Sequence, residues 1–272
     1  ACGSPASLRK GEGMSGYQLA ESFGHKIERL LPGLVQLRSD EAFIKALGGV
    51  RCQAGVALMV DGEKRAYETG EVQFTDYGVS GIPVFQMSRV GAAAIAENKN
   101  VEVILDFFPD QEKNAYVYMA KQRFETQQDK TLEEFMTGLL NKKINMVLLK
   151  RLGLKPDRKA GETGWQKISR LMEECRKFSI HISSANSMEN AQICAGGVKL
   201  EQISTELESE LVEGLYFTGE LLDVDGRCGG YNLQWAFTSG YIAGRNAAGS
   251  STKEIAAGSD PESEKLRGCP KC

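Results

Sequence analysis

The chain has 272 residues, with 33 Lys or Arg, 36 Asp or Glu and a formal net charge of −3. Because 42% of its residues are hydrophobic, it can bury a substantial core, which excludes a disordered chain and a collagen-like chain. The two signs of charge are well mixed along the sequence, so no basic face predicts nucleic-acid binding, and no apolar run reaches the roughly 18 residues that a membrane span needs.

Residues 15–31 carry apolar side chains at helical spacing up to Pro32-Gly33, which predicts one amphipathic helix. The pattern then shortens to that of β-strands. We predict strands at residues 54–60, 63–69, 71–75 and 101–108, with Asp61-Gly62 as a hairpin turn. A buried helix over residues 84–96 follows Pro83; the glycine-rich entry at Gly78–Pro83 is either a helix start aimed into a ligand cleft or simple packing.

After Pro109 the pattern becomes helical. We predict helices at residues 111–126, 131–140 and 142–152, the second opened by a capping box of Thr131 and Glu134. A polar linker, residues 153–164, leads to a helix over residues 165–177 and to strands at residues 178–184 and 191–194. The sequence therefore predicts a β-rich segment that carries an all-helical insert.

The last predicted elements are a buried strand over residues 214–218, a glycine-rich loop over residues 219–230, a helix over residues 231–246 and a disordered polar tail. An acidic residue at the end of a buried strand, followed by glycines that open a helix, is typical of cofactor sites in open α/β sheets. A plain strand–helix packing unit is the alternative, but packing alone does not require Glu220, Asp223 and Asp225 beside four loop glycines.

Three stretches together resemble one bacterial family. They are Gly196-Gly197-Val198 continued by residues 219–236, residues 11–17 with Gly24-His25, and residues 74–83. The resemblance, which extends over residues 1–244, is to the BaiN-like flavoproteins, NAD(P)/FAD-dependent oxidoreductases related to aminoacetone oxidase-like FAD-binding enzymes. It implies a mixed α/β (α+β) fold, in which a β-barrel domain with a small all-helical insert interrupts a Rossmann-like FAD-binding domain.

On this resemblance the FAD-binding domain is incomplete and divided. Its expected parts are residues 1–40 and 199–248; the barrel takes residues 41–108 and 164–198, the helical insert residues 109–163, and the tail residues 249–272. The family's strand–GxGxxG–helix unit is absent from the sequence, so the chain looks like the C-terminal two thirds of a longer protein.

The resemblance also implies the cofactor contacts. Glu220 would hydrogen-bond the ribityl chain of FAD, and the helix that starts after the glycines would face the pyrimidine edge of the flavin. The implied cofactor-binding residues are Cys2, Gly3, Gly219, Glu220, Asp223, Gly229, Gly230, Tyr231, Asn232 and Leu233. No catalytic residue is assigned, and no metal is expected, because the single pair Cys269 and Cys272 does not make a zinc site.

We therefore predict a cytoplasmic FAD enzyme that uses NAD(P)H to reduce a small-molecule acceptor such as an enone-like C=C bond. Seven scattered cysteines without a signal peptide favour that compartment. The alternative is a non-catalytic product of a truncated gene; a flavin-dependent RNA modifier is disfavoured by the missing basic patch. Cys228 is either a redox partner or an inert thiol, and His25 and His181 are expected to be structural.

Overall fold

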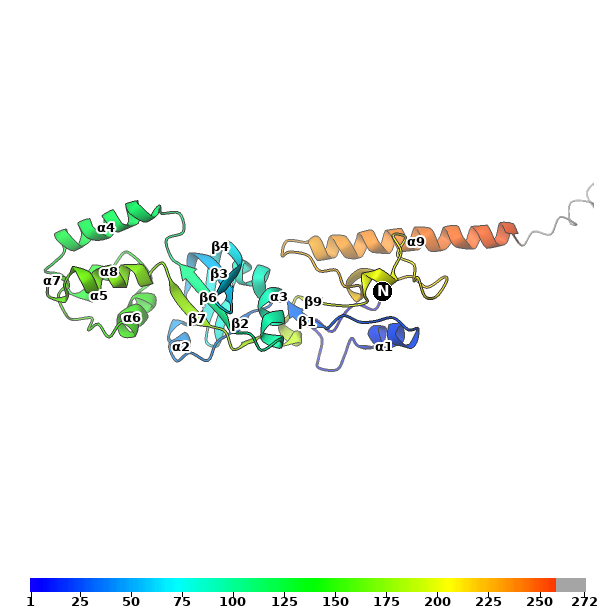
Figure 1. Ribbon diagram of the computed structural model, residues 1–272, viewed down its shortest axis with the longest axis horizontal. Coiled ribbons are helices and arrows are strands. Elements are labelled where there is room, and N and C mark those ends of the chain that lie inside the picture. Colours follow the sequence, from blue (N-terminus) through cyan, green and yellow to red (C-terminus); the bar gives the residue numbers. More distant parts are fainter. Residues whose placement is uncertain (258–272) are drawn as a thin grey trace, which may run out of the picture. The chain divides into compact units, whose positions relative to one another are not determined.

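The computed structural model describes the backbone of residues 1–257 and the side chains of residues 1–249. The chain divides into two compact units (Figure 1). We call Leu31–Ile193 the central unit, and Ala1–Leu30 with the chain from Cys194 onward the split unit. In sequence, the central unit is an insertion in the split unit.

A seven-stranded antiparallel sheet forms one part of the central unit. Its order is β7-β6-β3-β4-β5-β2-β8. The strands are β2 (Leu37–Arg38), β3 (Arg51–Val60), β4 (Glu63–Thr75), β5 (Gly78–Ser80), β6 (Val101–Asp106), β7 (Phe178–His181) and β8 (Ser184–Ala185). The outermost strands β7 and β8 are separated by two residues only, Ile182 and Ser183, so the sheet must curl until its two edges approach each other.

The central hairpin of this sheet forms where the sequence predicts it. Asp61 and Gly62 both have positive φ, 51° and 82°, as a two-residue turn of the primed type requires. Val60 pairs with Glu63 across the turn, which confirms the predicted hairpin. The strands are longer than predicted: β3 begins at Arg51, and β4 runs unbroken through residue 70.

Helix α3 (Ile82–Ala96) packs against β4 and β3 and against the short strand β1 (Leu31–Gly33). It starts with Pro83 in its first turn and Gly81 as its N-cap, with φ 111°. A Cβ at Gly81 would overlap the carbonyl oxygen of Glu71 on β4. The glycine is therefore required for packing, which is the simpler of the two predicted roles of this entry.

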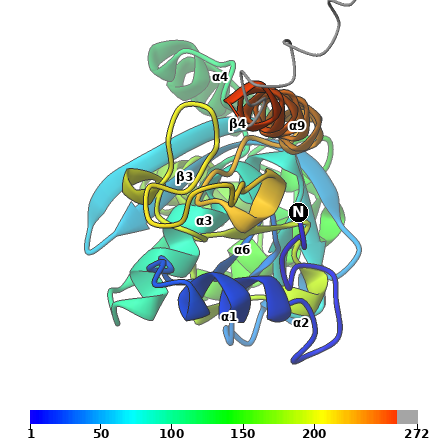
Figure 2. The same cartoon turned by 90° about the vertical axis from the view of Figure 1, so that its right-hand side faces the viewer.

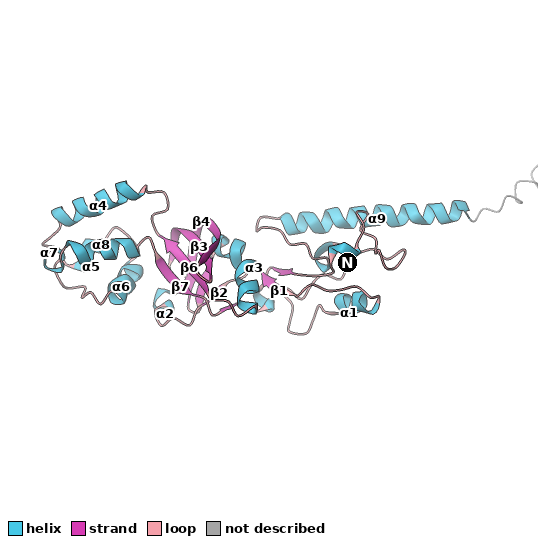
Figure 3. Cartoon of the chain, in the orientation of Figure 1, coloured by secondary structure: helices cyan, strands magenta, loops and turns pink. Residues whose placement is uncertain are grey.

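Five helices follow β6 and form the helical insert, drawn in cyan beside the magenta sheet in Figure 3. They are α4 (Lys113–Thr126), α5 (Leu132–Met136), α6 (Lys142–Arg151), α7 (Ala160–Thr163) and α8 (Trp165–Glu174). The predicted capping box of Thr131 and Glu134 is confirmed at the start of α5. One hydrophobic cluster joins the insert to the sheet and to α2 (Ile44–Leu47), with Phe135, Leu148 and Phe178 among its fully buried members.

The split unit contains α1 (Ser15–Ser22), α9 (Tyr231–Ala257) and the short 3₁₀ helices η2 (Leu200–Gln202) and η3 (Gly219–Leu221); α1 and α9 are labelled in Figure 2. The 3₁₀ helix η1 (Met188–Asn190) and strand β9 (Ile193–Ala195) lie where the chain leaves the central unit. The core of the split unit is small. It consists of Tyr17, Ala20, Val198, Leu207, Phe217, Leu221, Leu222 and Ala243.

Three predicted elements of the split unit differ from the structure. Helix α1 ends at Ser22 rather than at residue 31, because Gly24 takes φ 90° and the chain then extends. The predicted strand at residues 214–218 is wrong: Tyr216 makes an isolated bridge with Glu208, and Phe217 fills the core. Helix α9 continues to Ala257, beyond the predicted end, while residues 258–272 of the predicted tail lie outside the described residues.

None of the helices within residues 1–257 is both long enough and apolar enough to cross a membrane.

Candidate functional site

The carboxylate of Glu220 connects three segments of the split unit that are distant in sequence. Ser4 Oγ donates a hydrogen bond to Glu220 Oε2 at 2.7 Å, and the backbone N of Cys194 donates to Oε1 at 2.8 Å. Glu220 lies in η3, where it is partly exposed. Because an ionised carboxylate has about four acceptor positions, roughly half of its capacity is left for a ligand.

The first residues of the chain lie against this carboxylate. Ser4 is buried and bonded to Glu220, and Gly3, next to it, has φ 70° with no atom within 4 Å of a Cβ placed on it. A Cβ at Gly16 in α1 would lie 2.7 Å from the Cβ of Cys2, so the chain start packs directly on α1. The structure thus places the predicted residue Gly3 next to the Ser4 that binds Glu220, and the predicted residue Cys2 on α1.

Tyr17 of α1 also holds Glu220 in place. Its side chain is fully buried, and its hydroxyl donates to the carbonyl oxygen of Glu220 at 3.1 Å. Burial, together with the nearby Cys194 and Glu220, raises the pKa of Tyr17 well above its ordinary value. The hydroxyl therefore stays protonated at physiological pH and remains a donor that fixes η3.

Two side chains of α9 hold the other end of η3. The backbone N of Gly219 donates to Ser239 Oγ at 2.9 Å, and Trp235 Nε1 donates to the carbonyl oxygen of Gly219 at 3.1 Å. Gly219 has φ 67°, a conformation that glycine adopts without strain. Glu220 is therefore held from α1 on one side and from α9 on the other.

Asn232 closes the loop between η3 and α9. Its Oδ1 accepts from the backbone N of Gly226 at 2.7 Å, and its Nδ2 donates to the carbonyl oxygen of Gly226 at 3.0 Å. The side chain of this predicted cofactor residue thus holds the loop, with one bond accepted by Oδ1 and one donated by Nδ2.

Gly229 and Gly230 form the open end of the same loop. Both are exposed, with φ 127° and 91°, and no atom lies within 4 Å of a Cβ placed on Gly230. The backbone N of Gln234 bonds to the carbonyl oxygen of Gly230, so the amides of residues 231–233 precede the first such bond of α9 and have no partner within the helix. Bare amides at the positive end of a helix dipole attract an anion or an electron-rich ring edge.

The remaining predicted residues occupy the margins of the site. Asp223 follows η3 and donates its backbone N to the carbonyl oxygen of Val198 at 3.0 Å. The side chains of Tyr231 and Leu233 are exposed. A Cβ at Gly197 would lie 2.6 Å from the carbonyl carbon of Leu222, so this glycine permits close backbone contact next to Asp223.

His25 is buried beside this region and has a packing role. Its Nε2 lies 2.8 Å from Ser209 Oγ, and its ring meets that of Phe217 edge-on. Burial lowers the pKa of His25 below its ordinary value, so the ring is neutral at pH 7. The pair Cys269 and Cys272 lies outside the described residues.

The comparisons with known proteins divide the chain at the same points as its compact units. A family described as the HI0933-like protein barrel and H2TH domain matches residues 31–193, which are the limits of the central unit. The chain is 42% identical over 253 residues to the 3-dehydro-bile acid delta(4,6)-reductase of Clostridium scindens, a match that covers 91% of the chain and 61% of the relative.

Two further relatives carry a different name. The chain is 30% identical to the ribosomal RNA dihydrouridine synthase of Haemophilus influenzae over 83% of the chain and 54% of the relative. It is 27% identical to the synthase of the same name from Escherichia coli over 85% of the chain and 55% of the relative. The chain thus spans between 54% and 61% of the length of these curated relatives.

Proposed function

The chain belongs to the HI0933-like, or BaiN-like, flavoprotein family, and from that membership we propose that it acts in an FAD-dependent oxidoreductase. The proposed reaction is reduction of a C=C bond conjugated to a carbonyl group, with NAD(P)H as the reductant. The names of the relatives support this class, because the first is a delta(4,6)-reductase and dihydrouridine is uridine with one ring double bond saturated.

The observation that carries the proposal is the open glycine turn in front of α9. Gly230 has open space where a side chain would be, and the amides of residues 231–233 follow it without partners inside the helix. A flat ring can approach this turn closely, because neither Gly229 nor Gly230 has a side chain. These residues therefore fit the edge of a flavin.

We assign a role to each contact of the chain. Glu220 uses its remaining acceptor positions for ribityl hydroxyls, next to Cys2 and Gly3. The amides from Gly229 to Leu233 donate toward the pyrimidine edge, where negative charge gathers on reduction. Bound FAD supplies the hydride chemistry, while the protein supplies orientation and electrostatics. We also propose that the split unit has a Rossmann-like architecture and that Gly219 and Asp223 contact the FAD.

The experiment uses a protein in which this chain is joined to the part of the Clostridium scindens relative that it does not match. We expect the purified protein to retain bound flavin, to lose its visible absorbance when NADPH or NADH is added without oxygen, and to recover it when a steroid 4-en-3-one is added. Recovery with oxygen but not with enones would contradict the proposed acceptor. A folded protein without flavin would contradict the cofactor.

A second candidate reaction is reduction of uracil in RNA, and one observation favours it. Residues 142–170 hold nine lysines and arginines but two acidic residues, Asp157 and Glu162. Four lysines are among the ten residues, the others mostly apolar, that line a hollow of about 740 Å³ beside α6, and Arg151, Lys167 and Arg170 line a second hollow of about 220 Å³. No acidic residue is among the described residues that line either hollow. A local basic surface therefore exists, although the whole chain is acidic.

This candidate predicts salt-dependent RNA binding through the basic surface. The variant Lys150→Glu/Lys155→Glu should weaken binding of a uridine-rich RNA hairpin at least about tenfold, whereas Lys64→Glu/Lys121→Glu, with the same charge change at exposed sites elsewhere, should not. Equal loss in both double variants, or no binding by the original chain, would remove the candidate. Electrophoretic mobility at several salt concentrations measures the effect.

A further inference from the structure

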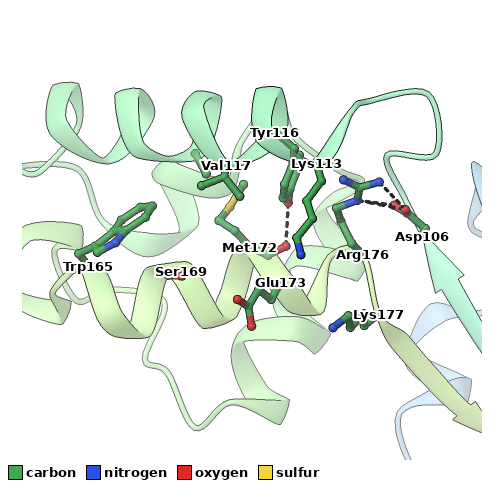
Figure 4. A pocket seen from close by; sticks show the side chains of 11 residues that line it. Asp106, Lys113, Tyr116, Val117, Trp165, Ser169, Met172, Glu173, Arg176 and Lys177 are labelled. Carbon is green, nitrogen blue, oxygen red and sulfur yellow. Dashed lines mark hydrogen bonds and ion pairs between the residues drawn. The ribbon is translucent and has the colours of Figure 1, made fainter.

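We propose that the helical insert binds a small apolar anion in a cavity between α4 and α8. The cavity has a volume of about 330 Å³ and is shown in Figure 4. All of its lining residues belong to the central unit, so this proposal does not rest on the proposed flavin site.

One end of the cavity is apolar. Val117 and Ala120 line it from α4, and Trp165 and Met172 line it from α8. Figure 4 places Trp165 at the end of the cavity away from the charged groups. Val117 is 49% exposed although it is apolar, so a hydrophobic ligand would cover a surface that is now in water.

The other end is cationic. Lys113 at the start of α4 and Lys177 just after α8 line this end, and Figure 4 shows both ammonium groups there. Among the residues that the structure describes, neither lysine has a salt-bridge partner, whereas Arg176 beside them is paired with Asp106. Glu173 is the one further acidic residue of the lining, so the groups not already paired carry a net positive charge.

Several contacts hold the charged end of the cavity and the wall next to it (Figure 4). Arg176 donates three hydrogen bonds of 2.9 to 3.2 Å to the carboxylate of Asp106, and its guanidinium lies over the ring of Tyr116. The hydroxyl of Tyr116 donates to the carbonyl oxygen of Met172 at 2.8 Å. These contacts occupy Arg176 and hold α4 to α8, so the cavity keeps its shape while both lysines stay available.

This arrangement selects one class of ligand. An apolar ring system that carries a single carboxylate or sulfonate places its rings against Trp165 and its charge between Lys113 and Lys177. A neutral apolar molecule leaves both ammonium groups unused. A polyphosphate would place charges against Val117 and Met172, where nothing compensates them.

Two fluorescent probes test this proposal on the intact chain. The first, 8-anilinonaphthalene-1-sulfonate, has the apolar rings and the anion; the second, N-phenyl-1-naphthylamine, has the rings without the anion. Lys113→Gln/Lys177→Gln should weaken sulfonate binding about tenfold and leave the neutral probe unchanged, because each exposed charge pair contributes a few-fold in affinity. Lys64→Gln/Lys121→Gln, which makes the same charge change at exposed positions outside this cavity and outside the basic surface, is the matched control.

Two single variants give the test opposite signs. Glu173→Gln should tighten sulfonate binding about two- to threefold, because it removes the repelling carboxylate. Val117→Asp should weaken it, whereas Tyr118→Asp on the neighbouring, 67% exposed position of α4 should not. Equal probe affinity in the Lys113→Gln/Lys177→Gln variant and its control would overturn the proposal. The proposal would also be overturned if light scattering showed that a change in self-association of the chain accounts for the probe signal.

Discussion

The central unit and the split unit differ in the contacts that stabilise each of them internally. The central unit has one hydrophobic cluster of 35 buried residues, while the cluster of the split unit has 8 among the residues described. The split unit relies instead on polar contacts that meet at η3, from Ser4, Tyr17 and Cys194 on one side and Trp235 on the other. The comparison shows that the candidate flavin site lies in the unit with the smaller core.

Helix α9 of the split unit exposes large apolar side chains, in contrast to α3 of the central unit. Leu233, Phe237 and Tyr241 are 66%, 72% and 70% exposed and recur every four residues, so they share one face. In α3 of the central unit, by contrast, Val84, Met87 and Ala94 are buried. Functional segments are often drawn from the less stable parts of a protein, which agrees with this division. We therefore expect the split unit to unfold first.

Removal of one core ring should have the largest effect. Phe178 is fully buried and contacts the rings of Phe43, Phe74 and Phe107. Phe178→Ala should lower the free energy of unfolding of the central unit by about 3 to 5 kcal/mol. Hydrogen exchange, read by peptide, should show the loss in the sheet and the insert. Comparable loss confined to the split unit would contradict the division into two cores.

Removal of the Glu220 carboxylate should have the next largest effect. Glu220→Ala leaves the donors of Ser4 and Cys194 without their acceptor, which should destabilise the split unit by about 1 to 3 kcal/mol. Glu213→Ala removes an exposed carboxylate nearby and should change stability by less than about 0.5 kcal/mol. Chemical denaturation of both variants measures the difference; equal values would mean that Glu220 does not hold η3.

The two tryptophans provide a direct comparison, because one lies in each unit. Trp235→Phe removes the donor to the carbonyl oxygen of Gly219 and should cost the split unit about 1 kcal/mol. Trp165→Phe in the insert should leave the stability of the split unit unchanged. Hydrogen exchange of peptides around Gly219 separates the two; the idea fails if both substitutions loosen η3 equally.

Acidification should have the smallest effect, confined to the split unit. Burial lowers the pKa of His25 from the ordinary value of 6.5, so below about pH 6.5 the unfolded state takes up a proton that the folded state resists. Stability should therefore be complete above that pH and decline as the pH falls toward the lowered pKa. His25→Gln should remove this decline in stability between pH 7 and 5 in denaturation curves, and His181→Gln should keep it. If the decline persists in His25→Gln, another titratable group causes it.

Local signals made part of the fold predictable. Asp61-Gly62 and the Thr131–Glu134 capping box determine their turns through nearby atoms, so the sequence alone reveals them. The run of residues 214–218 shows the limit of such signals, because an apolar stretch predicts burial but does not reveal whether a neighbouring strand exists. The helix predicted over residues 15–31 is too long, because apolar periodicity continues past Gly24, whose positive φ ends the helix.

The candidate site was predictable in its glycines and in Glu220, but not in what holds them. Ser4 and Glu220 are 216 residues apart and Tyr17 and Glu220 are 203 apart, so no local pattern connects them. The side-chain role of Asn232 was also missed, because its clamp on Gly226 depends on how the loop turns back. The prediction of no basic face rested on the charge balance of the whole chain, which does not exclude a local cluster such as that of residues 142–170.

The most direct test compares two glycines in the protein that joins this chain to the unmatched part of the Clostridium scindens relative. Gly230 and Gly214 are both exposed, have φ 91° and 75°, and have no atom within 4 Å of a placed Cβ, so valine brings similar backbone strain to each. The account predicts that Gly230→Val loses bound flavin, by visible absorbance per chain, while Gly214→Val retains it. Equal flavin content in the two variants would contradict the account.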